Sequence, residues 1–307
     1  MRRSRSAVLG AALLALALVA AACAGEEEPG GDGGKGGAKP SLTVGADNFA
    51  ESEIVAEMYA QVLENAGYDI SRKFGTTRET RIPAMETGEI DLAPEYLATL
   101  LLFLDPEAEA SSDPQKAAAA LEPLLAEKNL ATLEPSAAVD TNAFVVTQET
   151  AGAHGLASVS DLQPVAGELT LGGPPECPER PFCLPGLKEV YDIEFGEFVP
   201  LDAGGPLTIE ALDSGEIDVA LLFSTQSVIL DKGWLLLEDD KGLQSADNIT
   251  PLWNSESTDE EAEGLLNEVS ATLTTEKMTE LNGRVEIDGE DAADVARSHL
   301  EDEGLLS

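Results

Sequence analysis

The sequence predicts an α/β protein with two lobes of related design, each a mainly parallel sheet flanked by helices. The main observation is a repeat: residues Glu86–Ala93 read ETGEIDLA, and 127 positions later Asp213–Ala220 read DSGEIDVA. Each copy is typical of a helix end, a glycine stop and a short strand, because glycine takes the left-handed conformation after a helix without a Cβ penalty. So short an apolar run fits a strand buried on both faces of a parallel sheet. The alternative is a chance likeness between two helix-to-strand turns.

The order of elements in the first lobe also favours a parallel sheet. Leu42–Ala46 reads as a strand, and the helix after it ends at Gly67. A second strand closes at Arg72–Phe74, a helix follows over Arg78–Thr87, and the first copy of the repeat comes next. This β-α-β-α-β order is the pattern of a parallel sheet. The apolar face of the first helix consists of Ile54, Val55, Met58, Val62 and Leu63, and further helices are expected at Pro94–Leu104 and Gln115–Lys128.

We expect the chain to cross between the lobes twice. Val139–Thr147 has the β-branched character of a long strand and leads into the second lobe, and Asn248–Trp253 returns to the first, where 258–307 reads as helices. Two crossings imply a two-segment hinge, with 41–139 plus 247–307 as one lobe and 140–246 as the other. The second lobe is expected to contain helices near Ser160 and at Leu187–Tyr191 and Leu207–Leu212, and strands at Leu169–Gly172, Phe198–Leu201 and Trp234–Glu238.

Residues 1–23 read as an export signal that is not part of the fold. Arginines at positions 2, 3 and 5 precede the apolar run Ala7–Ala22, which is too short to span a bilayer comfortably. The segment resembles the bacterial lipoprotein signal, in which Cys23 becomes the lipidated first residue, although Ala20 stands where leucine is usual. Residues 24–40, rich in glycine, are expected to be a flexible tether. We therefore expect the protein on the extracytoplasmic face of the cell membrane, held by a lipid anchor, with ordinary secretion as the alternative.

Composition excludes one class of partner. The formal net charge is −40, from 58 acidic and 18 basic residues. This argues against nucleic acid, whose phosphates are bound through Lys and Arg. The acidic excess fits a saline habitat or, equally, a general acidic bias of the genome. Cys177 and Cys183 lie close together in a Pro-rich loop of an exported chain and are expected to form a disulfide. A metal site would need further ligands, and His154 and His299 are far away in sequence.

Motifs for catalysis are absent from the sequence. It contains no Gly-x-Ser-x-Gly, no His-Glu-x-x-His and no glycine-rich phosphate loop that opens a helix. We expect a protein that is not an enzyme and needs neither cofactor nor metal. A carboxylate-dependent extracellular hydrolase is the remaining catalytic alternative.

Candidate binding residues follow the strands of the first lobe. Asn48 and Phe49 lie where the first strand meets its helix, whose free amides can hold a carboxylate. Thr77 lies at the corresponding end of the second strand, and Tyr96 follows the third. Because ligands bind at the carboxyl ends of strands in open α/β sheets, these residues predict one wall of a cleft between the lobes.

The chain resembles the osmoprotectant-binding lipoproteins of ATP-driven (ABC) importers, which bind glycine betaine, carnitine or choline. The resemblance covers residues 41–307 and rests on GADNFAE at 45–51, GEIDLAPEY at 88–96, DTNA at 140–143, Arg180 before Gly186, and GEIDV at 215–219 leading to Phe223. It implies the clamshell fold of type II periplasmic binding proteins. It also implies a monomer that closes on one small solute and presents it to a membrane permease.

The same resemblance implies the ligand site. An aromatic box of tyrosines surrounds the quaternary ammonium group by cation–π attraction. Tyr96 matches one position of the box, whereas Asn142 and Phe223 stand where tyrosine is common, and Asp47 replaces the usual lysine before Asn48. Two ligand classes stay open: a betaine held by aromatic rings, or a more polar solute such as an amino acid. The residues implied are Asn48, Phe49, Thr77, Tyr96, Asp140, Asn142, Phe223 and Thr225, with Gln226 for the polar class and Arg180 either as the carboxylate partner or paired with a surface acid.

Overall fold

The computed structural model describes residues 39–111, 113–245, 247–257 and 259–306. The expected signal segment with Cys23, and the tether up to residue 38, lie outside these residues. Within the described part of the chain, no helix combines the length and apolarity that crossing a membrane requires.

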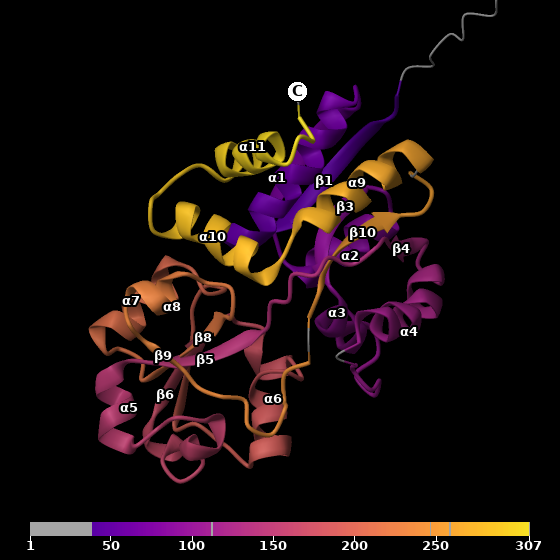
Figure 1. The fold of residues 1–307 in the computed structure, drawn as a ribbon. Helices are drawn as coiled ribbons and strands as arrows, with labels where there is room; N and C mark the ends of the chain where they lie inside the picture. Colours follow the sequence, from indigo (N-terminus) through magenta and orange to yellow (C-terminus); the bar gives the residue numbers. More distant parts are fainter. Residues whose placement is uncertain (1–38, 112, 246, 258, 307) are drawn as a thin grey trace, which may run out of the picture. The chain divides into compact units, whose positions relative to one another are not determined.

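The described chain contains two five-stranded sheets (Figure 1). In the first, β1 pairs in parallel with β2 and β3, and β10 runs antiparallel to both β3 and β4. The second sheet repeats this arrangement, with β6 parallel to β7 and β8, and β5 antiparallel to β8 and β9. The order in the first sheet is β2 (Asp69–Thr76), β1 (Ser41–Asp47), β3 (Leu92–Tyr96), β10 (Ile249–Asn254), β4 (Leu130–Thr132), and in the second β7 (Glu197–Pro200), β6 (Thr170–Gly173), β8 (Val219–Phe223), β5 (Asn142–Val146), β9 (Leu235–Leu236).

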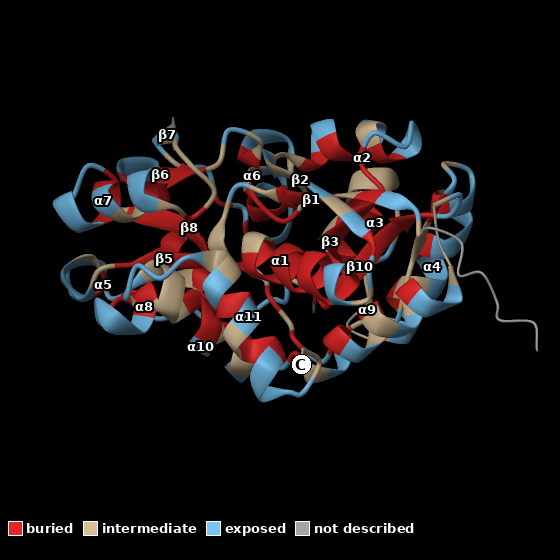
Figure 2. Ribbon diagram, turned by 90° about the horizontal axis from the view of Figure 1, so that it is seen from above, coloured by how far each residue is buried: buried red, intermediate tan, exposed pale blue. Residues whose placement is uncertain are grey.

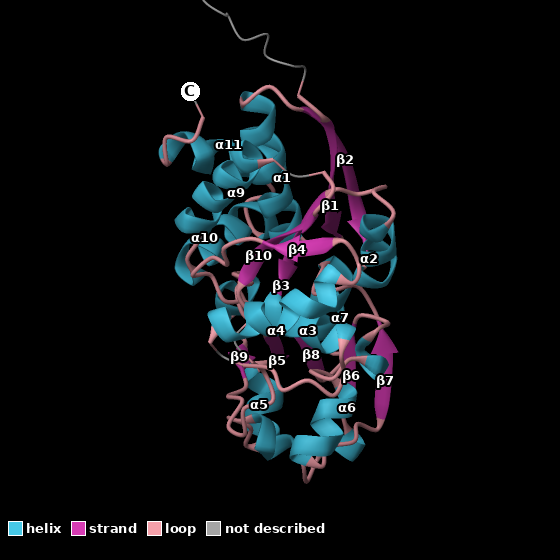
Figure 3. Ribbon diagram, turned by 90° about the vertical axis from the view of Figure 1, so that its right-hand side faces the viewer, coloured by secondary structure: helices cyan, strands magenta, loops and turns pink. Residues whose placement is uncertain are grey.

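Helices cover both faces of the first sheet (Figure 3). One core lies between the sheet and α1, α9, α10 and α11, and a second core joins the sheet to α2, α3 and α4. The residues expected on the apolar face of α1 are all buried, and the rest of the helix is largely buried as well, because α9, α10 and α11 cover the side that faces away from the sheet (Figure 2). These helices are α1 (Ala50–Asn65), α2 (Arg78–Glu86), α3 (Leu97–Leu104), α4 (Pro114–Ala126), α9 (Glu260–Thr272), α10 (Thr275–Glu286) and α11 (Ala292–Asp302).

The central strands of the second sheet are buried on both faces. Along β5, Phe144 and Val146 pack into one core while Ala143 and Val145 pack into the other. This alternation follows from the two-residue period of a strand, and burial on both faces explains the continuous apolar sequence. The helices here are α5 (Gln148–His154), α6 (Leu184–Gly186), α7 (Pro206–Ser214) and α8 (Val228–Asp231), with 3₁₀ turns at Val159–Leu162, Ala166–Glu168 and Cys177–Glu179 and a π turn at Leu187–Tyr191.

The sequence repeat forms the same structure in both sheets. Gly88 and Gly215 follow α2 and α7 with φ of 71° and 75°. In each copy the aspartate that comes three residues later joins two parallel strands: the Thr43 amide donates to Asp91 Oδ2 at 2.7 Å, and the Thr170 amide donates to the Asp218 carboxylate at 2.8 Å. The backbone amide of each aspartate donates in return to the carbonyl of the same threonine. The likeness of the two copies is therefore structural and not a coincidence of turns.

The chain crosses between the sheets at two adjacent segments. Val139 and Asn248 form an antiparallel bridge, and the Asp140 amide donates to the Asp247 carbonyl at 3.0 Å. Each crossing leads directly into the antiparallel strand of the sheet it enters, β5 or β10. The long strand expected over Val139–Thr147 is accordingly shorter, because its first residues belong to the crossing.

Other element boundaries also differ from expectation. Pro94–Tyr96 continue β3, so that the helix expected from Pro94 begins at Leu97. The strand expected at Trp234–Glu238 is only Leu235–Leu236, and α5, α8 and β4 were not predicted.

Candidate functional site

A cavity of about 500 Å³ lies where the crossings and the carboxyl ends of strands from both sheets meet. Most of the residues predicted from the sequence line it, and the exceptions are Thr225 and Gln226, which are buried and are not part of the cavity lining. The predicted residues that line it are Asn48, Phe49, Thr77, Tyr96, Asp140, Asn142, Arg180 and Phe223.

Three aromatic rings gather at the cavity from both sheets. Phe49 is the N-cap residue of α1, Tyr96 ends β3, and Phe223 ends β8. The centroid of the Phe49 ring lies 4.9 Å from that of Phe223 and 6.2 Å from that of Tyr96. Tyr96 and Phe223 occupy equivalent positions, since each is the last residue of the third strand of its sheet and pairs with the first residue of the antiparallel strand. The repeated topology thus places one ring on each side of the site.

Glu51, which does not line the cavity, accepts a hydrogen bond from the hydroxyl of Tyr96. The Tyr96 hydroxyl donates to Glu51 Oε1 at 2.9 Å, whereas the Thr225 hydroxyl and the Asn282 side-chain amide donate to Glu51 Oε2 at 2.6 and 2.9 Å. Burial raises the pKa of Glu51, although these three hydrogen bonds oppose the rise. Burial likewise raises the pKa of the Tyr96 phenol, which keeps this hydroxyl a donor.

Asp140 lines the cavity beside this cluster. Its Oδ1 accepts from the Ser224 hydroxyl at 3.0 Å and from the Thr225 amide at 3.1 Å. Burial, reinforced by the charge of Glu51, raises the pKa of the Asp140 carboxyl well above its usual range. Thr225 therefore joins two buried carboxyl groups, through its hydroxyl and its amide.

A buried ion-pair network supports the end of β3. Glu95 is fully buried and accepts from Arg78 Nη2 at 2.8 Å and also from Arg81. Arg81 in turn pairs with Asp47 at 2.7 Å. Burial alone would raise the pKa of Glu95, but the charges of Arg78 and Arg81 lower it to about 2. Asp47, the acid that replaces the usual lysine, therefore neutralises a buried arginine.

Arg180 already has an acidic partner. Its Nη2 lies 2.6 Å from Glu79 Oε1, on the first turn of α2, and its guanidinium stands 5.8 Å from the centre of the Phe103 ring. Burial, together with the charge of Arg78, lowers the pKa of Arg180. Both ends of this ion pair are partly exposed, so that a ligand carboxylate at Arg180 would share it with Glu79 or take the place of Glu79.

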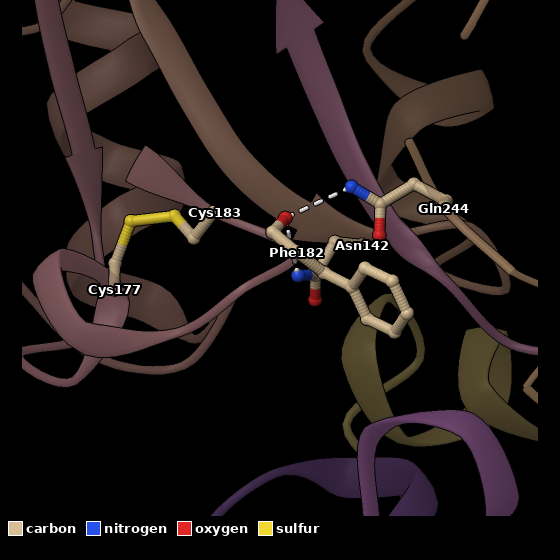
Figure 4. The surroundings of a disulfide bond; sticks show 5 residues. All are labelled: Asn142, Cys177, Phe182, Cys183 and Gln244. Atoms are coloured by element: carbon tan, nitrogen blue, oxygen red, sulfur yellow. Dashed lines mark hydrogen bonds between the residues drawn. A yellow bond between two sulfur atoms is a disulfide. The ribbon is translucent and has the colours of Figure 1, made fainter. Parts of the chain in front are cut away.

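The loop that carries Arg180 is closed by the expected disulfide. Cys177 and Cys183 are bonded, and both line the cavity (Figure 4). Between them, the Phe182 carbonyl accepts from Asn142 Nδ2 at 3.1 Å and from Gln244 Nε2 at 2.9 Å. Asn142, predicted as a ligand contact, thus also attaches the disulfide loop to β5.

Sequence reasoning missed several of these residues. Glu51 stands among the acids of the first helical turn, where acids are common because of the helix dipole, so that nothing in the pattern marks it as buried. Glu95 lay inside the recognised 88–96 motif, but its partners Arg78 and Arg81 had no local signal. Phe103 and Phe182 also line the cavity and resemble ordinary core residues in the sequence.

Comparison with known proteins agrees with this geometry. Residues 40–302 match the family model for the substrate binding domain of the ABC-type glycine betaine transport system. The carnitine transport binding protein OpuCC of Listeria monocytogenes is 31% identical over 255 residues, covering 80% of this chain and 82% of the relative. The glycine betaine-binding protein YehZ of Escherichia coli is 28% identical over 277 residues, covering 86% and 90%.

A solved structure shows the same two-lobed architecture. The crystal structure of a glycine betaine/carnitine/choline ABC transporter superposes with a TM-score of 0.67 at 25% identity, covering 87% of this chain and 100% of that one. The expected α/β fold with two lobes is therefore confirmed. The chain belongs to the substrate-binding proteins of ABC-type glycine betaine transport systems.

Proposed function

We propose that this protein binds glycine betaine or a related quaternary ammonium compound in the cavity and delivers it to a membrane permease, without catalysing a reaction. The observation that carries the proposal is the meeting of Phe49, Tyr96 and Phe223 at one cavity. A trimethylammonium group placed against these rings gains about 0.5–2 kcal/mol from each face by cation–π attraction. A ring contributed by each lobe also lets the ligand favour one arrangement of the lobes, which contacts to a single lobe do not achieve.

The carboxylate of such a ligand is assigned to the polar residues of the cavity. Arg180 is its charged partner in this proposal and exchanges Glu79 for the ligand. Asn48 and Thr77, which line the cavity near the starts of α1 and α2, offer neutral polar contacts. Thr225 acts indirectly, through Glu51 and Asp140. The lobes are taken as 41–139 with 247–307 and 140–246, which assigns strands β1–β4 and β10 to one lobe and β5–β9 to the other.

A ligand panel tests the proposal. Thermal unfolding is followed with glycine betaine, carnitine, choline, proline and a polyol, and calorimetry then measures the affinity of each compound that raises the melting temperature. A ligand that binds only the folded protein must raise it. We expect the quaternary ammonium compounds to do so. A rise with proline or the polyol alone would overturn the assignment, and turnover of an ester or glycoside would favour the hydrolase.

Anchoring is part of the proposal and rests on the sequence. Lipidation of Cys23 would hold a monomer outside the cytoplasm by the tether 24–40, within reach of its permease. In a bacterial host, Cys23→Ser should release the protein from the membrane fraction. Wild-type protein in the soluble fraction would indicate ordinary secretion.

A further inference from the structure

Two buried acidic side chains from different parts of the chain are linked through Thr225 near the aromatic rings. Glu51 belongs to α1, and Asp140 belongs to the crossing that precedes β5. Their side chains are joined by Thr225, whose hydroxyl donates to Glu51 at 2.6 Å and whose amide donates to Asp140 at 3.1 Å. Glu51 is 3% exposed and Asp140 4% exposed, so that water does little to stabilise a charge on either.

Neither acid has a basic partner. Among the described residues, every ion pair within 4.0 Å involves other groups, and the nearby Arg78 and Arg81 pair with Glu95 and Asp47. The other titratable groups around the two acids do not stabilise a second negative charge. Tyr96 faces both acids from β3, Glu286 lies near Glu51 from α10, and Asp247 adjoins Asp140 at the second crossing; none of the three carries positive charge. Two carboxyl groups that are buried without a basic partner and linked through one threonine ionise together only at high cost, because each charge opposes the other.

We infer that Glu51 and Asp140 together carry one proton in the ligand-free protein, so that only one of them is ionised, and that the cationic head of a bound ligand displaces this proton to the solvent. Glu51 is then a specificity-determining residue for cations, although it does not line the cavity itself. The inference rests on the proposed binding of a quaternary ammonium compound. Burial raises the pKa of both carboxyl groups, and the charge of Glu51 raises that of Asp140 further, which is the condition for the proton to be held.

The geometry connects this charge to the ligand in two ways. Asp140 borders the cavity directly, so that a cation there stabilises its ionised form. Glu51 acts through the Tyr96 hydroxyl, because an ionised acceptor draws the phenol proton towards itself and makes the ring a better partner for a cation. Release of one proton per ligand would strengthen binding by up to about tenfold for each unit of pH, over the range in which the proton is released.

Calorimetry with glycine betaine as the probe tests the inference. Binding is measured at pH 7.5 in phosphate and in Tris, whose ionisation enthalpies differ, so that the difference in heat gives the number of protons released. The wild-type protein should release protons and bind more tightly at pH 8 than at pH 6. Glu51→Gln, which keeps an acceptor for Tyr96, should release almost none, lose its pH dependence and bind about tenfold more weakly at pH 8. Asp140→Asn should behave in the same way.

Control variants make the outcome decisive. Glu57→Gln alters another buried acid of α1, one that is paired with Arg72 at 2.7 Å and is not part of the cavity lining, and should leave proton release unchanged. Glu286→Gln tests the third acid, and loss of release in this variant alone would overturn the role of Glu51. Binding of glycine betaine without proton release would also overturn the inference while leaving the proposed function intact. No binding of any quaternary ammonium compound would overturn both, and melting curves show that each variant is folded.

Discussion

Replacement of Tyr96 separates the contribution of its ring from that of its hydroxyl. Tyr96→Phe keeps the aromatic face at the cavity and removes the donor that Glu51 accepts at 2.9 Å. Tyr96→Leu removes the hydroxyl and the face together but keeps apolar volume, which limits the cavity that Ala would leave in this 6% exposed position. The difference between the Phe and Leu variants therefore isolates the aromatic face.

The magnitude follows from the three-ring arrangement. One face contributes about 0.5–2 kcal/mol to binding of a desolvated cation, which corresponds to a factor of about 2 to 30 in the dissociation constant. Phe49 and Phe223 remain, with ring centroids 4.9 Å apart, so that binding should weaken and not disappear. We expect Tyr96→Leu to bind glycine betaine about 2- to 30-fold more weakly than Tyr96→Phe in calorimetry at one pH.

A matched control distinguishes binding from stability. Tyr59, on α1, is buried in the same core as Tyr96 but does not line the cavity, and Tyr59→Leu should lower the melting temperature without changing the affinity. If Tyr96→Leu binds glycine betaine as tightly as Tyr96→Phe does, the ring at position 96 takes no part in holding the ligand, and the aromatic site is wrong at this position.

Further predictions concern the groups that build the site. Glu95→Gln should lower the free energy of unfolding in urea by about 3–5 kcal/mol at pH 7, because it leaves two buried arginines without their shared partner. The stabilisation by Glu95 is complete above its unfolded pKa of about 4.3 and is lost as the pH falls through its folded pKa of about 2, so that the deficit of the variant should shrink on titration from pH 5 to pH 2; an unchanged deficit would contradict the pairing. Asp91→Ala and Asp218→Ala should each cost about 1–3 kcal/mol, since each leaves a strand amide unpaired, and clearly unequal losses would count against equivalent roles. Replacing Cys177 and Cys183 by Ser should cost about 2 kcal/mol, the value for so short a closed loop, and should weaken ligand binding as well, because the loop borders the cavity; unaltered affinity would show that the loop holds its position without the bond.

Local signals explain how much of the fold was predictable. The glycines at 88 and 215, with positive φ, and the apolar runs after them mark helix ends and strands without reference to the rest of the chain. The edge strand β4 has no such signal, because its three residues become a strand only by pairing with β10, which lies far away in sequence. The segment from Val139 was expected to be a strand because its composition resembles that of β5. Only tertiary contacts determine that the hydrogen-bonded strand begins at Asn142.

The residues of the site also fall into those that the local sequence predicts and those that it does not. Phe49 and Tyr96 were predictable because the carboxyl ends of strands in α/β sheets lie at one edge, so that position along the chain implies position in space, and Phe223 was predicted from the family resemblance. Glu51 was not, since a carboxylate in the first turn of a helix is ordinarily solvated, and its burial depends on Thr225 and Asn282 from remote segments.

The two copies of the repeat differ at the residues that end their strands. Tyr96 and Phe223 end equivalent strands, yet only Tyr96 has a hydroxyl, and that hydroxyl reaches Glu51. Thr225, two residues after Phe223, donates to the same carboxylate from the second sheet. The equivalent rings thus border the cavity from two sheets, while one buried acid connects both strand ends. In the proposed function, a cation at these rings would contact both sheets and the charge that joins them, so that recognition of the ligand and the relative placement of the two sheets would depend on the same few contacts.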